Sequence, residues 1–459
     1  MPLLTDGLEL ETNLDEDNKK DIKPANVAKI FERCIPFARD SNKNLYYYKD
    51  GVYCPDANQV ISEWYRQLVE YWGKQGDWKP TTVEHIASYI KCYCPILLDR
   101  PLMNRINLKN GIYDWHQEKL LPHSSDNLTT VQLPINYDPD ATCPEWDGFI
   151  ESVFPEGRQL LYELIGLLTI PYTRLQKTIL LLGPGSNGKG TFLRAINKFL
   201  GEDNVSHVSL HQLEEEKFSR GMIVGKLVNM FGDLPVYKID KTNFFKSLTG
   251  EDTIQIEHKG QTPFSYVPFC RIIFSGNKLP KVDDDTEGYL RRWLVIPFLR
   301  KFQVDPSKGE NIESLLTNPR ELSGVFNKAM KYLPNVIDHG FTITEEIAGI
   351  ISNYQPIPEN IIRWIADTLV EDPLGRVPMK ALYNYYQLSL VGSRGGEKEG
   401  SIKGKFVTFL KSSFPGLKSG EQVWNWNGTM TGNRRCYAGI RMINPQLLRD
   451  IKDIEAIAG

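Results

Sequence analysis

The hydrophobic pattern divides the chain into a middle part rich in strand-like segments and two flanks with helical periodicity. Apolar, β-branched runs of the kind found in buried strands occupy residues 178–182, 226–231, 271–276 and 293–298. The intervals between the first three runs are long enough for helical crossovers, which parallel strands require. After the first run, apolar residues recur at helical spacing over 192–200. The pattern therefore predicts an α/β core built on a parallel sheet.

The N-terminal flank follows a helical period from about residue 25 to residue 100. Aromatic and aliphatic residues between 60 and 72 fall on one helix face and predict a packed helical core. A Lys-Asn-Gly turn within residues 106–121 predicts a hairpin. Two further helices are expected at 145–153 and 157–170, directly before the first strand of the core.

The C-terminal flank combines helices with a terminal hairpin. Strand-like residues on either side of an Asn-Gly turn at 427–428 predict the hairpin, with 423–426 and 434–443 as its strands. Helices are expected at 361–370, 379–391 and 401–414. Three helices and a two-stranded wing are typical of a winged-helix module.

A glycine-rich turn joins the strand at 178–182 to the helix that follows it. Its spelling, G-P-G-S-N-G-K-G-T, contains the G-x4-G-K signature of a phosphate-binding loop, in which backbone N–H groups and a lysine hold the phosphates of a nucleotide. The position after the lysine, where Ser or Thr usually serves Mg²⁺, is Gly190, and Thr191 follows it. We expect ATP to bind at Gly183, Pro184, Gly185, Ser186, Asn187, Gly188, Lys189, Gly190 and Thr191.

Polar residues follow the other core strands at the places where nucleotide chemistry needs them. Asp233 comes after the strand at 226–231, where a carboxylate can hold Mg²⁺ and polarise water. Asn277 ends the next strand and can orient that water. Arg291 and Arg292 precede the last strand, where a guanidinium can reach a phosphate as an arginine finger.

In this order, the segments G-P-G-S-N-G-K-G-T, N-M-F-G-D-L-P, I-I-F-S-G-N-K-L-P and Y-L-R-R-W-L-V-I-P-F resemble superfamily 3 helicases. The resemblance is to the phage and plasmid primase–helicase branch related to the poxvirus helicase–primase. Residues 108–114 and 137–146 are similar to the helical domain that precedes the ATPase in this branch. The resemblance implies an AAA+-type core, assembly as a ring that is usually a hexamer, and 3′ to 5′ translocation on single-stranded DNA.

The resemblance also implies roles for individual residues. Lys189 and Thr191 match the Walker A positions. Asp233 matches the Walker B acid, and Asn277 matches sensor 1. Arg292, or Arg291 beside it, matches the arginine finger. Thr191 and Asp233 are the implied Mg²⁺ ligands. Residues 254–266 form an expected hairpin that resembles the one these helicases project into their channel, so that His258 and Lys259 would contact DNA.

Five regions follow from the pattern and the resemblance together. We expect an acidic tail at 1–24, a helical N-terminal domain at 25–155 and the ATPase core at 156–300. A helical connector at 301–355 and a winged-helix-like DNA-binding domain at 356–459 should follow.

Charge and composition bear on three properties: DNA contact, the redox setting and membrane insertion. The net charge of −3 excludes a uniformly basic protein, but residues 376–459 hold 13 Lys and Arg against 6 Asp and Glu. This local excess favours DNA contact, with Lys403, Lys405, Arg434 and Arg435 as candidates. Seven scattered cysteines form no zinc spacing and, with no secretory signal, predict a reducing, cytoplasmic setting. No apolar stretch is long enough for a membrane span.

Three functions remain open on the sequence alone. The first is an ATP-dependent replicative helicase of a phage, plasmid or other mobile element, acting on single-stranded and forked DNA. The second is a nucleotide kinase, because some kinases share the G-K-G-T spelling. The third is a DNA-binding initiator that uses ATP only to assemble. We expect no primer synthesis by this chain alone, and therefore a separate primase or polymerase as partner.

Overall fold

The computed structural model describes most of the chain between residues 23 and 444, in two compact units. One unit comprises residues up to 281 together with 292–342, and the other comprises 282–291 together with 343–459. The described residues are 23–232, 234, 238–239, 243–260, 262–277, 281–282, 289, 291–298, 300, 312–343, 359–389, 406–407, 410, 413–414, 416–426 and 429–444.

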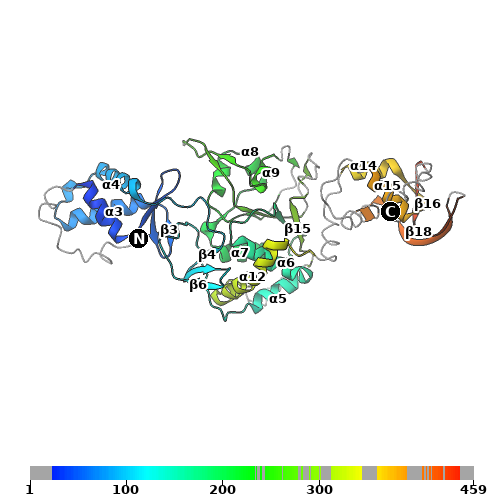
Figure 1. The fold of residues 1–459 in the computed structure, drawn as a ribbon, viewed down its shortest axis with the longest axis horizontal. Helices are drawn as coiled ribbons and strands as arrows, with labels where there is room; N and C mark the ends of the chain where they lie inside the picture. Colours follow the sequence, from blue (N-terminus) through cyan, green and yellow to red (C-terminus); the bar gives the residue numbers. More distant parts are fainter. Residues whose placement is uncertain are drawn as a thin grey trace. The chain divides into compact units, whose positions relative to one another are not determined.

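A five-stranded sheet forms the centre of the first unit (Figure 1). Its strand order is β15-β7-β13-β9-β8, and every pairing is parallel. The strands are β7 (Thr178–Leu182), β8 (Val205–Ser206), β9 (Val228–Phe231), β13 (Arg271–Gly276) and β15 (Trp293–Pro297). Every residue of β7, β13 and β15 is buried, which explains why these segments are continuous apolar runs. The predicted parallel sheet is confirmed.

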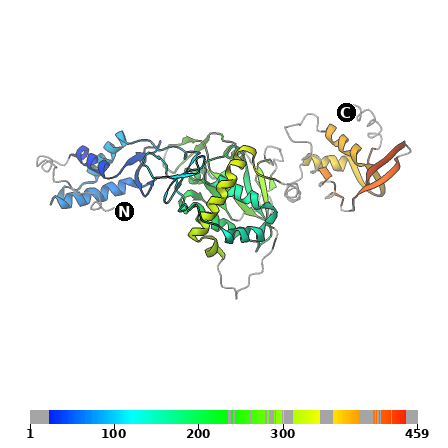
Figure 2. The ribbon, with the colours of Figure 1, turned by 60° about the horizontal axis from the view of Figure 1, so that its bottom comes forward.

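Long helices cover one side of this sheet. The pair α6 (Arg158–Leu168) and α12 (Pro319–His339) packs closely, and Figure 2 shows α12 in yellow-green. A Cβ atom on Gly166 would lie 2.9 Å from the Ala329 carbonyl oxygen, so glycine permits the close approach. The remaining helical elements around them are α5 (Pro144–Val153), η3 (Pro155–Gly157), α7 (Lys189–Leu200), η4 (Glu202–Asn204) and α11 (Ile312–Leu316). The helices expected at 145–153, 157–170 and 192–200 are therefore confirmed as α5, α6 and most of α7.

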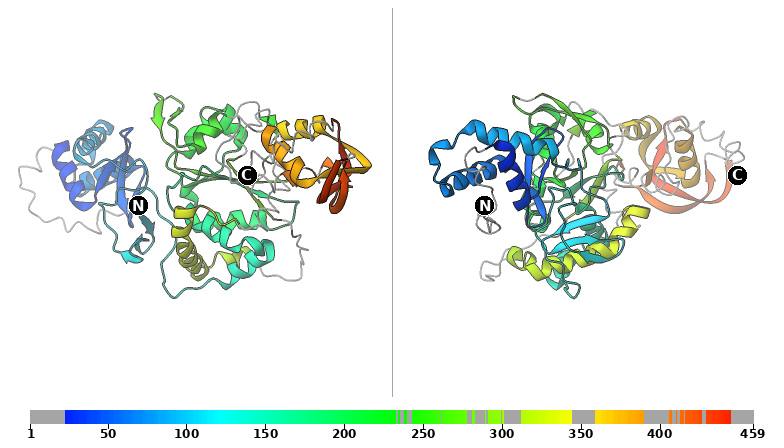
Figure 3. Two further views of the ribbon diagram at one scale, coloured as in Figure 1. Left: turned by 45° about the vertical axis from the view of Figure 1, so that its right-hand side comes forward. Right: turned by 60° about the vertical axis from the view of Figure 1, so that its left-hand side comes forward.

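A smaller layer lies on the other side of the sheet, drawn in green in Figure 3. It contains α8 (Leu210–Glu215), η5 (Ser219–Ile223), α9 (Asn243–Thr249) and an antiparallel hairpin of β11 (Ile254–Ile256) and β12 (Phe264–Tyr266). The hairpin expected over 254–266 is present. Two further short strands are β10 (Lys238–Ile239) and β14 (Lys281–Val282).

The N-terminal part of the first unit is only partly as expected. Its helices α2 (Pro24–Cys34), α3 (Ala57–Tyr71) and α4 (Pro80–Tyr93), with the turn η2 (Gln75–Asp77), bury an aromatic-rich core that includes Trp64. Residues 37–54, however, form a three-stranded antiparallel sheet of β1 (Phe37–Arg39), β2 (Leu45–Lys49) and β3 (Val52–Cys54). The helical expectation is wrong there, because Asp50 and Gly51 have φ of 49° and 88° and make the tight turn between β2 and β3.

The second antiparallel sheet follows the predicted hairpin. It consists of β4 (Arg105–Leu108), β5 (Gly111–Asp114) and β6 (Lys119–Leu121), and Leu108 pairs with Gly111 across the Lys-Asn turn. This confirms the hairpin within 106–121.

The second unit contains α14 (Glu359–Thr368), α15 (Met379–Ser389) and a sheet of order β16-β18-β17. The strands are β16 (Leu369–Pro378), β17 (Lys418–Trp426) and β18 (Thr429–Met442). The first two predicted helices and the hairpin are confirmed, whereas β16 was not expected. Of the third predicted helix, 401–414, only five residues belong to the described part of the chain. The winged-helix assignment stays a prediction. Among the described helices, none is both long and apolar enough to cross a bilayer.

Candidate functional site

The glycine-rich loop connects the end of β7 to the start of α7 at one edge of the central sheet. Gly183 N donates to Gly276 O at the end of β13, and Phe298 N donates to Leu182 O after β15. The loop is thus bordered by the carboxyl ends of two neighbouring strands. Ligands of open parallel sheets bind at this edge.

Two glycines are required by the geometry of the loop. A Cβ atom on Gly183 would lie 2.1 Å from Phe298 O and 2.2 Å from Asn187 Nδ2. Gly188 has a φ of 86°, and its Cβ would lie 2.9 Å from Val153 of α5. Pro184, Gly185 and Ser186 between them are exposed, so this part of the loop is open to solvent.

Lys189 lies inside the loop, with only 7% of its surface exposed. Its Nζ donates to Gly183 O at 2.6 Å, to Asn187 Oδ1 at 2.9 Å and to Pro184 O at 3.3 Å. The ammonium group is therefore placed at the centre of the turn by oxygen acceptors that an anionic phosphate can replace.

Asn187 was predicted only as one member of the loop, but the structure gives it a distinct position. Its Nδ2 donates to Phe298 O at 2.5 Å, while its Oδ1 accepts from Lys189. The residue is 97% buried. It thereby joins the lysine to the segment after β15, which no local pattern reveals.

Gly190 and Thr191 lie in the first turn of α7, the helix that begins at Lys189. Gly190 is exposed and Thr191 is half-buried. A Cβ on Gly190 would come within 3.1 Å of Arg194 Nη1. The hydroxyl that could serve a metal ion is therefore one residue further along the helix than usual.

The two residues predicted at strand ends differ in what the structure describes of them. Asp233 lies outside the described residues, but its neighbour Leu234 donates from N to Ser275 O of β13 at 2.7 Å. Asn277 directly follows β13 and is exposed. Leu234 therefore lies beside the end of β13, the strand that Asn277 follows. In the part of the chain that is described, no group of three His, Cys, Asp or Glu forms a metal site.

The two candidate arginines have opposite environments. Arg291 is exposed, whereas Arg292 is 92% buried. Arg292 Nε donates to Thr249 Oγ1 at 2.8 Å, and its Nη2 lies 3.4 Å from Lys246 O, both on α9. The guanidinium of Arg292 is thus directed into its own subunit.

The candidate DNA-contacting residues also differ from one another. The His258 ring stacks on Phe264 with ring centroids 5.7 Å apart, and a Cβ on Gly221 would lie 2.6 Å from it. Lys259 is exposed at the hairpin turn, next to Gly260 with φ of 78°. Of the basic C-terminal candidates, Arg435 is exposed on β18, the side chain of Arg434 is not described, and Lys403 and Lys405 lie outside the described residues.

Glu214, an acid that contacts the start of α9, has a shifted pKa. Glu214 of α8 accepts a hydrogen bond from Phe245 N at 2.8 Å. Burial raises the pKa of Glu214 to about 7, although backbone hydrogen bonds and Arg220 oppose the shift.

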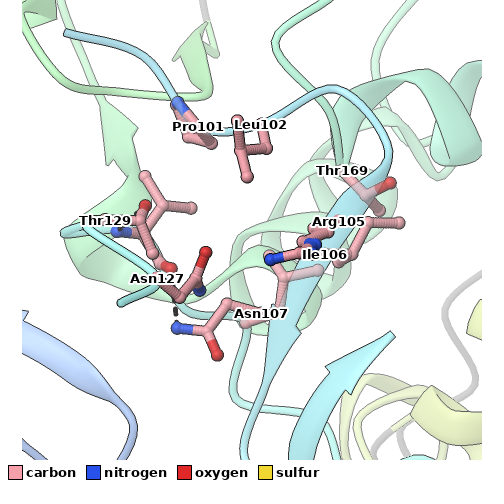
Figure 4. Close-up of a pocket in the computed structure, with 10 residues that line it drawn as sticks. Pro101, Leu102, Arg105, Ile106, Asn107, Asn127, Thr129 and Thr169 are labelled. Carbon is pink, nitrogen blue, oxygen red and sulfur yellow. Dashed lines mark hydrogen bonds between the residues drawn. The ribbon is translucent and has the colours of Figure 1, made fainter. Parts of the chain in front are cut away.

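A separate pocket lies away from the loop, between the segment before β4 and the end of α6 (Figure 4). Arg105, Asn107, Thr129 and Thr169 are among the residues that line it. Its volume of about 10 Å³ matches a single water molecule and is far too small for a nucleotide. The candidate nucleotide site is the glycine-rich loop, because Lys189 lies at its centre among oxygen acceptors.

Comparisons with known proteins agree with the motifs. Residues 46–155 match the family model "D5 N terminal like", and residues 181–292 match "Family of unknown function (DUF5906)". The chain is 27% identical over 210 residues to "Putative helicase L207/L206" of Acanthamoeba polyphaga mimivirus, covering 43% of this chain and 22% of that protein. It is 23% identical over 235 residues to "Putative helicase 121R" of Invertebrate iridescent virus 3, covering 47% of this chain and 25% of that protein. The chain spans about a quarter of the length of these curated relatives.

The fold has a counterpart among solved structures. The A-form apo structure of the NrS-1 C-terminal region aligns with a TM-score of 0.50 at 13% identity, covering 91% of this chain and all of that one. At this identity the likeness concerns the fold alone. The two family matches and the viral relatives agree with the ordered motifs, and together they make the chain similar to D5-like superfamily 3 helicases related to the poxvirus helicase–primase.

Proposed function

We propose that this protein is an ATP-dependent DNA helicase that assembles as a ring and moves 3′ to 5′ on single-stranded DNA during replication of a virus, phage or plasmid. The observation that carries the proposal is the glycine-rich loop with Lys189 held at its centre, at the carboxyl edge of a parallel sheet. The names of the two viral relatives support helicase activity in particular.

In the proposed mechanism, the loop binds the phosphates of ATP. Lys189 exchanges its carbonyl partners for phosphate oxygens, and the N-terminus of α7 adds the favourable end of its dipole. The exposed Arg291 fits a finger that reaches the nucleotide of a neighbouring subunit better than the buried Arg292 does.

Hydrolysis needs a positioned water and neutralised phosphate charge. We assign the polarising carboxylate to Asp233 and the orienting amide to Asn277, because both follow strands that end beside the loop. Thr191 and Asp233 are the residues that would hold Mg²⁺, which supplies charge stabilisation to the phosphates. The oxygen donors of both side chains suit this ion.

The proposal is tested by measuring ATP hydrolysis with and without single-stranded DNA, followed by unwinding of a forked duplex. We expect DNA to stimulate hydrolysis, ATP to drive unwinding, and Lys189→Ala to abolish both. Phosphate transfer to a nucleotide acceptor, with no DNA stimulation, would identify a nucleotide kinase instead. ATP-dependent assembly on DNA without unwinding of either fork polarity would identify an initiator.

A further inference from the structure

Two consecutive residues at the start of β15 attach helix α9 to the central sheet. The guanidinium of Arg292 donates to Thr249 Oγ1 and contacts Lys246 O. The ring of Trp293 stacks on Phe245, with centroids 5.2 Å apart and planes 18° from parallel. Since Arg292 and Trp293 are both more than 90% buried, these contacts are internal and not part of a solvent-exposed surface.

The guanidinium suits the end of α9 for electrostatic and steric reasons. The last carbonyl groups of a helix carry partial negative charge, which a cation stabilises. Gly250 follows α9 directly, and a Cβ there would lie 2.8 Å from Lys246 O and 3.6 Å from Arg292 Nη2. The turn therefore leaves room for a planar fork, which lysine cannot reproduce.

Helix α9 is held at its other end as well, and it leads directly into the DNA-binding hairpin. Glu214 accepts from Phe245 N in the first turn of α9. Only four residues separate the end of α9 from β11. One of them, Glu251, accepts a hydrogen bond from Thr173 at 2.7 Å. The hairpin that carries Lys259 is thus joined to α9 by a short connector.

At the same point, the backbone of Arg292 is tied to the strand that carries the nucleotide loop. Its carbonyl oxygen accepts from Thr178 N, the first residue of β7, at 2.7 Å. Its neighbour in the chain is Arg291, the exposed residue that we assign to the subunit interface. Arg292 therefore lies where a change at the finger can reach α9.

We propose that Arg292 is a positioning residue that couples the nucleotide state to the DNA-binding hairpin through α9, and that it does not itself touch ATP. This inference rests on the proposed helicase function. It separates the two adjacent arginines into an interface residue and a coupling residue.

The test compares Arg292→Gln with the matched control Arg291→Gln in the full-length protein. For Arg292→Gln we expect basal ATP hydrolysis and single-stranded DNA affinity near those of the wild type, while DNA stimulation falls about fivefold or more. For Arg291→Gln we expect the rate of basal ATP hydrolysis itself to fall about 10³-fold. A purely structural role would lower the melting temperature and basal turnover of Arg292→Gln together, and would overturn the inference.

A second variant probes the same contact from α9. Thr249→Val removes the hydroxyl that accepts from Arg292 with little change in shape, so it should also reduce stimulation. The double variant should reduce stimulation by less than the two single effects combined, since both variants remove the Arg292–Thr249 hydrogen bond, although Thr249 Oγ1 also donates to Phe245 O within α9. If Arg292→Gln does not fold, full DNA stimulation of Thr249→Val contradicts the inference and reduced stimulation supports it.

The outcomes also distinguish the two proposals. A wild-type protein that DNA stimulates, with Arg292→Gln stimulated equally, overturns the coupling role and leaves the helicase proposal standing. A wild-type protein that DNA does not stimulate overturns both. If Arg292→Gln loses basal hydrolysis and recovers it when mixed with Lys189→Ala subunits, Arg292 is the finger after all.

Discussion

At the scale of single residues, Asn187 connects the phosphate-binding lysine to the last strand of the sheet. Its amide donates to Phe298 O and accepts from Lys189, so it satisfies one buried carbonyl and orients one buried ammonium. A buried donor or acceptor that loses its hydrogen-bond partner costs about 1–3 kcal/mol. Asn187 should therefore matter for nucleotide binding although it carries no charge.

We predict that Asn187→Ala weakens ATP binding by about 10-fold or more, which corresponds to the lost hydrogen bonds. Titration with an ATP analogue measures this directly. Ser186→Ala, on the exposed part of the same loop, is the matched control: it keeps the backbone N–H groups expected to hold phosphate, so affinity should fall far less than in Asn187→Ala. Equal affinities for the wild type and Asn187→Ala would show that Lys189 does not need this support.

Glu214 makes a prediction about pH, because its pKa is raised to about 7 by burial. An acid whose pKa is higher in the folded state favours folding when protonated. Its contribution is complete below the unfolded pKa and is lost as pH rises through about 7. Glu214→Gln does not titrate, so the variant should gain stability relative to the wild type between pH 5 and pH 8.

The expected gain at pH 8 is about 1–3 kcal/mol in the free energy of unfolding, with a much smaller difference at pH 5. Urea unfolding at the two pH values measures it. A difference that grows toward low pH would mean that the pKa of Glu214 is lowered rather than raised.

At the scale of elements, the β11–β12 hairpin presents two residues with different roles. His258 is packed between Phe264 and Gly221, so it shapes the turn. Lys259 is exposed beside it and is the residue free of such packing to approach phosphate. The hairpin therefore combines a packed imidazole with an exposed ammonium group at its turn.

Lys259→Ala should leave basal ATP hydrolysis intact and abolish unwinding, because the hairpin holds no group that we place on ATP. In a plot of the logarithm of single-stranded DNA affinity against the logarithm of salt concentration, each lost phosphate contact should also reduce the slope by about 0.7. Arg435→Ala, in the second unit, is the control and should affect DNA capture without affecting translocation on a loaded strand. Unwinding at wild-type speed by Lys259→Ala would place the hairpin outside the DNA path.

At the scale of the whole molecule, a finger supplied by a neighbouring subunit makes activity a property of the assembly. An arginine acting in trans is worth about 10³–10⁵ in turnover. Single substitutions at Lys189 and Arg291 should therefore both inactivate a ring, yet they damage different sides of each interface.

Mixing Lys189→Ala with Arg291→Ala subunits should restore part of the activity, because some interfaces then combine an intact loop with an intact arginine. Hydrolysis as a function of mixing ratio measures the recovery, and electron microscopy with an ATP analogue and DNA reports the subunit number. Mixed rings that form but recover no hydrolysis would exclude a trans role for Arg291.

The sequence by itself determined the features that local patterns encode. The core strands are continuous apolar runs because parallel strands are buried on both faces. The loop from Gly183 to Thr191 was recognisable because phosphate binding constrains glycine spacing over nine residues. The Asp-Gly turn at 50–51 was an equally local signal for the missed sheet of β1–β3, and the aromatic helical pattern around it obscured it.

The tertiary structure alone decided how distant residues meet. Strand β15 lies beside β7, which brings Phe298 to Asn187, 111 residues away in the chain. The same pairing places Arg292 against Thr249 and leaves Arg291 exposed, although the two arginines are adjacent and chemically identical. Residues 291 and 292 lie in a turn just before β15, and which of the two side chains is buried depends on the elements packed against that turn. For this reason, the pair of arginines was predictable from the sequence, but their different environments were not.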